Sequence, residues 1–172
     1  QGARRHAREA LARARERQAR APAVLLMEGK LLAAEGEQDE AEHRFRSVLE
    51  MAPSQEEARV QLGNLLLGQR RLGEAERLFR EGLMKLPQSA FLHMGLGHSL
   101  ALAGKMNEAI ESFQRALELA PRLPALLNSL GFAYLEINKV EKGLHLLKRS
   151  LEISPNQPEL TAFLNKLRSP EP

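Results

Sequence analysis

Cysteine is absent from the 172-residue chain, which excludes disulfides, thiolate zinc sites and a cysteine nucleophile. Tryptophan is absent too, Tyr134 is the single tyrosine and β-branched residues are sparse, so a large β-sheet is not expected. Asp39 is the single aspartate among 22 acidic residues, which excludes a site built on two aspartates. No apolar run approaches the roughly 18 residues that a membrane-spanning helix needs.

The residues that are abundant favour a folded, helical protein. Apolar residues make up 43% and charged residues 27% of the chain, a composition typical of globular domains and not of disordered ones. Leu, Ala, Glu and Arg dominate, and all four are good helix formers. The length suits a single domain with a buried core.

The net charge of +3 is unevenly placed. Residues 1–21 contain seven arginines and two glutamates, a net charge of +5, so the other 151 residues carry −2. A nucleic-acid-binding function for the whole chain therefore loses its main support. We expect residues 1–21 to form an arginine-rich helix, the second helix of a truncated repeat. The chain starts at Gln1 and not at methionine, which indicates a processed or excised piece.

An internal repeat of 34 residues is the strongest signal in the sequence. It is visible in four columns, one of glycine, one of proline, one of small residues and one of large apolar residues. The glycine column holds Gly29, Gly63, Gly97 and Gly131. The proline column holds Pro53, Pro87, Pro121 and Pro155. The small column holds Ala41, Ala75, Ala109 and Gly143, and the large column holds Phe45, Phe79, Phe113 and Leu147.

Each unit is predicted to contain two helices. Large apolar residues flank the glycine at helical spacing in the first helix, and the second helix ends just before the proline. A break between the two helices is predicted at Gly36, Arg70, Gly104 and Asn138, three of which tolerate a left-handed backbone. Asp39 and Asn107 are predicted N-caps of second helices.

The glycine column predicts close contact between the two helices of a unit. A glycine inside a helix costs about 1 kcal/mol relative to alanine. Four such glycines are tolerable if each lets a large residue of the second helix approach closely. The small and large columns, four residues apart, provide the facing surface.

This pattern resembles the tetratricopeptide repeat, a helix–turn–helix of 34 residues with small residues at positions 8 and 20, Phe at 24 and Pro at 32. With Gly29 at position 8, the units are residues 22–55, 56–89, 90–123 and 124–157. Residues 158–172 then contain a capping helix, the first helix of an incomplete fifth unit, and a tail. The resemblance implies an all-α fold, a right-handed α-solenoid of stacked helix pairs.

Two departures from the family pattern stand out. Position 4, usually a large apolar residue, holds Arg59 in the second unit and His93 in the third. The fourth unit has Gly143 and Ser150 in its second helix, so we expect its packing to be the loosest.

Proteins of this family bind partners in a groove lined by the first helices, and the resemblance places positions 2, 5, 6 and 9 there. This face is unusually apolar, which favours a peptide or an amphipathic helix as its occupant. An alternative interpretation is that these side chains pack against neighbouring second helices. The predicted groove residues are Met27, Lys30, Val60, Gln61, Asn64, Phe91, Met94, His98, Asn128 and Phe132.

No catalytic, metal or cofactor site is predicted. His93 and His98 are five residues apart and do not share a helix face, whereas a zinc pair on a helix is four apart. A Ser–His–Asp set is implausible with one aspartate.

The sequence thus predicts a non-enzymatic scaffold that binds a peptide or amphipathic helix of a partner protein. One alternative is a regulatory or targeting domain of a larger enzyme. Another is nucleic-acid binding through residues 1–21, which is less favoured because that segment lacks interleaved aromatics. A homo-oligomer is a further alternative, because an incomplete first unit would expose its apolar side.

Overall fold

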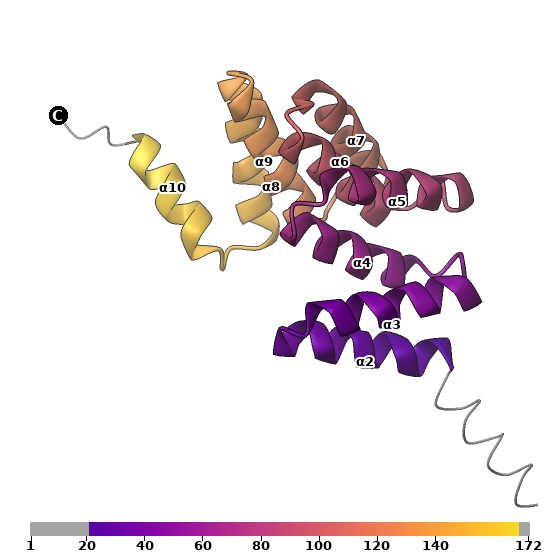
Figure 1. Ribbon diagram of the computed structural model, residues 1–172. Helices are drawn as coiled ribbons and strands as arrows, with labels where there is room; N and C mark the ends of the chain where they lie inside the picture. The colour runs from indigo at the N-terminus through magenta and orange to yellow at the C-terminus, as the bar shows by residue number, and fades with distance from the viewer. Residues whose placement is uncertain (1–20, 169–172) are drawn as a thin grey trace, which may run out of the picture.

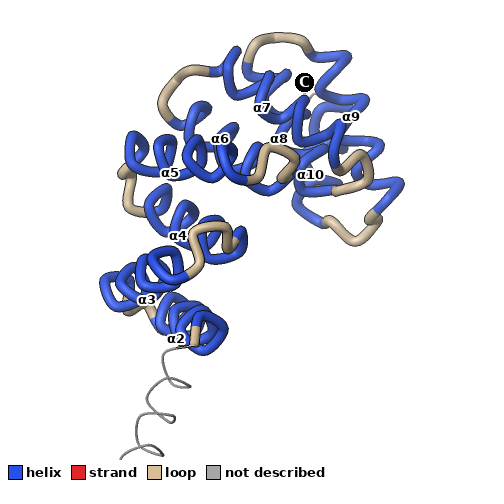
Figure 2. The backbone as a smooth tube through the Cα atoms, turned by 90° about the vertical axis from the view of Figure 1, so that its right-hand side faces the viewer, coloured by secondary structure: helices blue, strands red, loops and turns tan. Residues whose placement is uncertain are grey.

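A computed structural model describes residues 21–168, and within them all regular structure is helical (Figures 1 and 2). The helices of the first two pairs are α2 (Pro22–Glu35), α3 (Gln38–Met51), α4 (Glu56–Gly68) and α5 (Leu72–Lys85). They are followed by α6 (Ala90–Leu102), α7 (Met106–Leu119), α8 (Pro124–Glu136), α9 (Val140–Ile153) and α10 (Pro158–Arg168). The predicted all-α fold is confirmed.

The helices stack in chain order. Each first helix, α2, α4, α6 or α8, packs on the second helix that follows it, and each second helix packs on the next first helix. The first helices also contact one another along the array, while α10 packs on α9 at the C-terminal end (Figure 1). This arrangement is an α-solenoid, in which each unit contacts only its neighbours.

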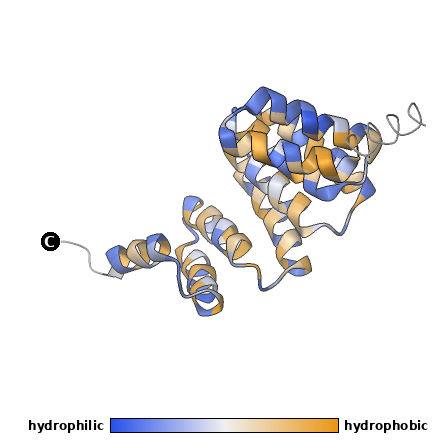
Figure 3. Cartoon of the chain, turned by 90° about the horizontal axis from the view of Figure 1, so that it is seen from below, coloured by the Kyte–Doolittle hydropathy of each residue, from blue (hydrophilic) through white to orange (hydrophobic). Residues whose placement is uncertain are grey.

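The core runs along the array between the helices. Ala41, Ala75 and Ala109 are fully buried, as are the large residues Phe45 and Phe79. The helices carry hydrophobic residues on one side and hydrophilic residues on another (Figure 3), so that each buries an apolar stripe against its neighbours.

The glycine column permits the close contact that the sequence predicts. A Cβ at Gly29 would lie 2.6 Å from the ring of Phe45, and one at Gly97 would lie 2.5 Å from the ring of Phe113. Gly63 faces Phe79 in the same way. Real Cβ atoms do not approach other atoms this closely, so the ring occupies the space that any side chain at the glycine would need.

The turns between paired helices adopt the predicted left-handed backbone. The φ angles are 89° at Gly36, 62° at Arg70, 78° at Gly104 and 60° at Asn138. Arg70 adopts this conformation although it is neither glycine nor asparagine. The fold of the unit therefore imposes the turn even on a residue that disfavours it.

The predicted N-caps at Asp39 and Asn107 are wrong. Helix α3 begins at Gln38 and α7 at Met106, so the N-caps are Glu37 and Lys105, and neither makes a side-chain capping bond. The left-handed turn residue is followed by a single residue before the helix starts, which places Asp39 inside the first turn. A carboxylate there still favours the helix dipole.

The fourth unit is not loosely packed, contrary to expectation. A Cβ at Gly143 would lie 2.7 Å from the carbonyl oxygen of Gly131, so the backbones of α8 and α9 are in direct contact. Two facing glycines let the helices approach more closely and replace the ring that fills this space in the other units. Ser150 is fully buried, and its hydroxyl donates to the carbonyl of Pro124.

Arg59 at position 4 is accommodated by a second departure from the family pattern. It is 5% exposed, and its guanidinium donates to the carbonyls of Pro53 (2.8 Å) and Leu78 (3.2 Å). A Cβ at Gly82 would collide with the Arg59 side chain, so glycine at position 27 of this unit makes room for the arginine. The buried guanidinium thus has hydrogen-bond acceptors, as a buried cation requires.

Candidate functional site

The ten predicted groove residues all lie on first helices, from α2 to α8. We refer to the side of the array that carries them as the first-helix face. Met27 on α2 is 68% exposed, Phe91 on α6 is 48% exposed and Phe132 on α8 is 44% exposed. Large apolar side chains as exposed as these, repeated along one face, are typical of an interaction surface.

Three of the ten residues are less accessible. Val60 and Met94 are partly buried and pack against the core, and Gln61 is partly buried as well. For Val60 and Met94 the alternative interpretation therefore applies in part, because neighbouring helices cover some of their surface. Asn64 is exposed on α4.

Polar contacts join neighbouring first helices across this face. Lys30 on α2 donates to Glu57 on α4 at 2.7 Å, and both side chains remain about half exposed. An exposed pair of this kind is worth roughly 0–1 kcal/mol. It fixes the position of the two side chains more than it stabilises the fold.

His98 links α6 to α8. Its Nε2 lies 2.8 Å from the hydroxyl oxygen of Ser129, and its ring packs edge-on against Phe113 with 5.1 Å between ring centroids. Burial lowers the pKa of His98, so the imidazole is neutral at pH 7. In this contact His98 serves as a packing and hydrogen-bonding residue.

Two hollows flank α8, and Asn128 and Phe132 line both of them. One, of about 360 Å³, lies between α6 and α8 and is also lined by His98 and Phe113. The other, of about 410 Å³, lies between α8 and α10 and is closed on the far side by Leu160 and Phe163. Phe132 is therefore a ridge between two recesses, each large enough for one or more side chains.

The α8–α10 hollow has an apolar wall and a polar end. Phe132 and Phe163 form the wall, in an edge-on contact with 5.3 Å between ring centroids. At the other end the Asn128 amide nitrogen donates to Gln157 Oε1 at 2.7 Å. The amide oxygen of Asn128 is buried and has no hydrogen-bond partner within residues 21–168. A buried acceptor without a partner costs about 1–3 kcal/mol, so a ligand N–H there would be favourable.

Sequence analysis did not predict the roles of Ser129, Gln157 and Phe163 in this region. Ser129 and Phe163 occupy position 6 of their units, so the repeat register could have found them. Gln157 lies in the connection between α9 and α10, where no periodic pattern indicates which side chain it will meet.

Residues 21–168 contain no group of three or more His, Cys, Asp or Glu side chains arranged to hold a metal ion. No helix in that range is long and apolar enough to cross a membrane. The arginine-rich segment that could bind nucleic acid lies outside the described residues, apart from Ala21.

The fold defines the class of protein, a scaffold built from paired helices in a solenoid. Two family models agree with it: a tetratricopeptide repeat model matches residues 32–95, and a second TPR repeat model matches residues 97–138. The chain belongs to the tetratricopeptide repeat family, and so to a class of protein–protein interaction scaffolds that are generally not enzymes. No curated protein matches the chain in sequence.

Solved structures of other proteins share this fold. The chain is similar to MamA (residue 41 to the end) from Desulfovibrio magneticus RS-1, with 22% identity and a TM-score of 0.67 over 81% of this chain and 79% of that one. It is also similar to pilF of Pseudomonas aeruginosa, with 21% identity and a TM-score of 0.75 over 86% of this chain and 69% of that one. At these identities the likeness concerns the fold alone.

Proposed function

We propose that the first-helix face is a groove that binds an apolar peptide or amphipathic helix of a partner protein. The observation that carries this proposal is the repeated exposure of large apolar side chains, Met27, Phe91 and Phe132, on three first helices. A few buried apolar anchors suffice for a micromolar affinity, which corresponds to about −8 kcal/mol.

The two hollows beside Phe132 support the proposal, because they offer places for anchoring side chains. The unpartnered oxygen of Asn128 adds a hydrogen-bond acceptor at the same place. The main-chain N–H groups inside a helix are already bonded, so the donor for Asn128 would be a side chain, an extended segment or the first turn of a helix. Apolar anchors together with one polar contact are typical of peptide recognition.

Replacing Phe91, Met94 and Phe132 with alanine should abolish partner capture, because it removes the apolar anchors of this face. The measurement is affinity capture with the chain as bait, followed by titration of the captured partner or its peptide into the purified variant. The expected loss of affinity is at least about tenfold. Met94 packs partly on the core, so circular dichroism must show that the variant is folded. The double variant Phe91→Ala/Phe132→Ala leaves the core untouched and should show the same direction of effect.

Three exposed apolar residues on second helices provide a matched control. They are Met51, Met84 and Val140, all at least 46% exposed. Replacing them with alanine removes a similar amount of apolar surface from the other side of the array and should leave capture unchanged. Retained capture by the folded groove variant, or equal loss in the control, would contradict the groove assignment.

A further inference from the structure

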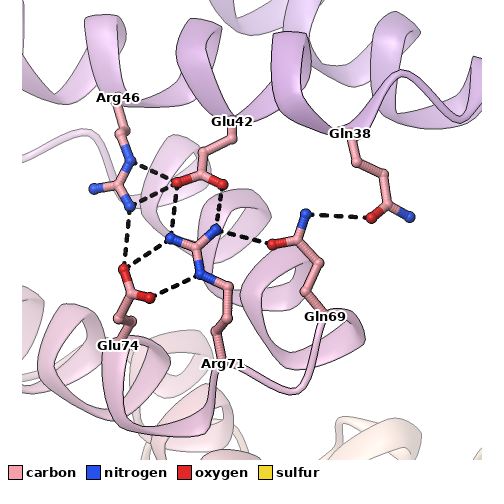
Figure 4. A network of polar contacts seen from close by, with 6 residues as sticks. All are labelled: Gln38, Glu42, Arg46, Gln69, Arg71 and Glu74. Carbon is pink, nitrogen blue, oxygen red and sulfur yellow. Dashed lines mark hydrogen bonds and ion pairs between the residues drawn. The ribbon is translucent and has the colours of Figure 1, made fainter.

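Ion pairs connect successive second helices at equivalent positions of the repeat (Figure 4). Between α3 and α5, Arg46 lies 3.5 Å from Glu74, and Arg71 beside α5 lies 2.5 Å from Glu42. Thirty-four residues later, between α5 and α7, the same four positions are again paired. Arg80 lies 3.6 Å from Glu108, and Lys105 lies 3.1 Å from Glu76. We call these contacts the ionic ladder.

The ladder stops between α7 and α9, because the residues at its four positions change. Both glutamate positions lose their carboxylate: Lys142 stands where Glu74 and Glu108 stand, and Ile110 where Glu42 and Glu76 stand. Gln114 replaces the arginine of the first pair, and Lys139 keeps the cation of the second. Neither Lys139 nor Lys142 has an ion-pair partner within residues 21–168. This step of the ladder therefore retains cations and has lost both of its anions.

A hollow of about 580 Å³ opens beside the broken step, between α7, α8 and α9. Its apolar part includes Leu117, Leu130 and Leu146. Its polar rim includes Lys142, His145 and Arg149. One carboxylate, that of Glu118, also lines the hollow, and it is paired with Arg115 at 2.6 Å. The volume lies within the range of ligand sites, about 300–1,000 Å³.

Hydrogen-bond donors converge on this hollow. The hydroxyl oxygen of Tyr134 accepts a bond from the Gln114 amide at 2.8 Å, which leaves the hydroxyl proton to donate. The Lys142 ammonium lies 5.9 Å from the centre of the Tyr134 ring. Arg149 uses one guanidinium nitrogen for the carbonyl of Pro121 at 2.8 Å, and it makes no ion pair in the described part of the chain. Its other N–H groups are left for an acceptor.

We propose that this hollow is a second binding site, on the side opposite to the groove, for an acidic segment of a partner polypeptide. An aspartate or glutamate of the partner takes the place of the missing ladder carboxylates, between Lys142 and Arg149. A neighbouring aliphatic side chain of the partner packs on the leucine floor. Charge complementarity selects this occupant, because cations without anionic partners surround an apolar recess.

The site is tested with random 12-residue peptides displayed as a library and selected on the immobilised full chain. The expected result is enrichment of peptides in which Asp or Glu adjoins Leu, Ile, Val or Met. A fluorescein-labelled enriched peptide is then titrated by fluorescence anisotropy. Its affinity should weaken as NaCl is raised, because salt screens the charges at the rim.

The decisive variant rebuilds the ladder. The double substitution Gln114→Arg/Lys142→Glu restores the pair that Arg46 and Glu74 make, and that Arg80 and Glu108 repeat. It should weaken peptide binding at least tenfold, while the melting temperature by circular dichroism stays equal or rises. Lys148→Glu is the matched control, an exposed change on α9 outside the hollow, and it should leave the affinity within twofold of wild type.

Three results would overturn the proposal. One is a selection that enriches no acidic peptide. Another is unchanged binding to the folded double variant, or an equal loss in Lys148→Glu, since either shows that the restored pair is irrelevant. The third is loss of the peptide on the groove variant Phe91→Ala/Phe132→Ala, which would place the peptide on the first-helix face. Retention of the peptide by that groove variant separates this site from the proposed groove.

Discussion

At the scale of single residues, Arg70 shows how strongly the repeat controls local backbone. Its φ of 62° is a conformation that glycine adopts freely and that costs other residues about 1–2 kcal/mol. Gly36 and Gly104 occupy the same place in the first and third units without that cost. Position within the unit therefore determines the turn, and residue type determines its energy.

Replacing Arg70 with glycine should raise the free energy of unfolding by about 0.5–1 kcal/mol. The strain at φ 62° is relieved, and the gain is reduced by the larger entropy of glycine in the unfolded chain. Equilibrium denaturation in urea measures it. Gly104→Ala is the converse test, and it should lower stability by a similar amount because φ is 78° there. A loss of stability in Arg70→Gly would contradict this account.

At the scale of helices, contact between the two helices of a unit depends on the glycine of the first helix. At Gly97, a Cβ would meet the ring of Phe113, which is buried and cannot move aside. At Gly68, the last residue of α4, a Cβ would meet nothing within 4 Å. The two glycines share residue type and helical backbone but differ in surroundings.

Gly97→Ala should destabilise the protein by about 1–3 kcal/mol, the usual cost of overpacking a core. Gly68→Ala should stabilise it by up to about 1 kcal/mol, because alanine is the better helix former and has free space. Urea denaturation of both variants under one set of conditions makes the comparison. Effects of the same sign would show that helix propensity, and not the ring opposite the glycine, controls stability.

At the scale of the whole molecule, the ionic ladder links successive units along the array. The hydrogen bond from Arg71 is the main cause of the lowered pKa of Glu42 and of Glu74. For Glu76, burial acts to raise the pKa, but hydrogen bonds from Arg80 and Lys105 outweigh it and the pKa is lowered. A carboxyl whose pKa is lower in the folded than in the unfolded state stabilises the fold fully above the unfolded value. That contribution is lost as the pH falls through the folded pKa.

The melting temperature should therefore fall as the pH is lowered below about 4.5, the unperturbed value for these glutamates. The variant Glu42→Gln/Glu76→Gln should melt at a lower temperature than wild type at pH 7, with the difference shrinking toward pH 3. Circular dichroism between pH 7 and 3 follows both proteins. Glu40→Gln, at an exposed position with no ion pair within residues 21–168, should track wild type throughout. Parallel curves for wild type and the double variant would show that the ladder carries no acid-sensitive stability.

The sequence by itself determined the repeat, its register and the contacts inside each helix pair. These features depend on residues close together in the chain and recur every 34 residues, so one column predicts four places. Gly29, Gly97 and the left-handed turns at Gly36 and Gly104 were all predictable in this way. Asp39 was misplaced as an N-cap because a helix start depends on the preceding turn, and a shift of two residues leaves the periodicity intact.

Only the tertiary structure decided what happens between units. Sequence placed Met94 and Phe132 on the same face, but neighbouring helices cover Met94 in part and leave Phe132 exposed as a ridge between two hollows. The broken ladder at Lys142 is visible as a charge change in the sequence, yet the hollow beside it depends on how far α7 and α9 stand apart. Distances between helices of different units arise from the packing of many side chains at once, and no single column of the repeat contains them.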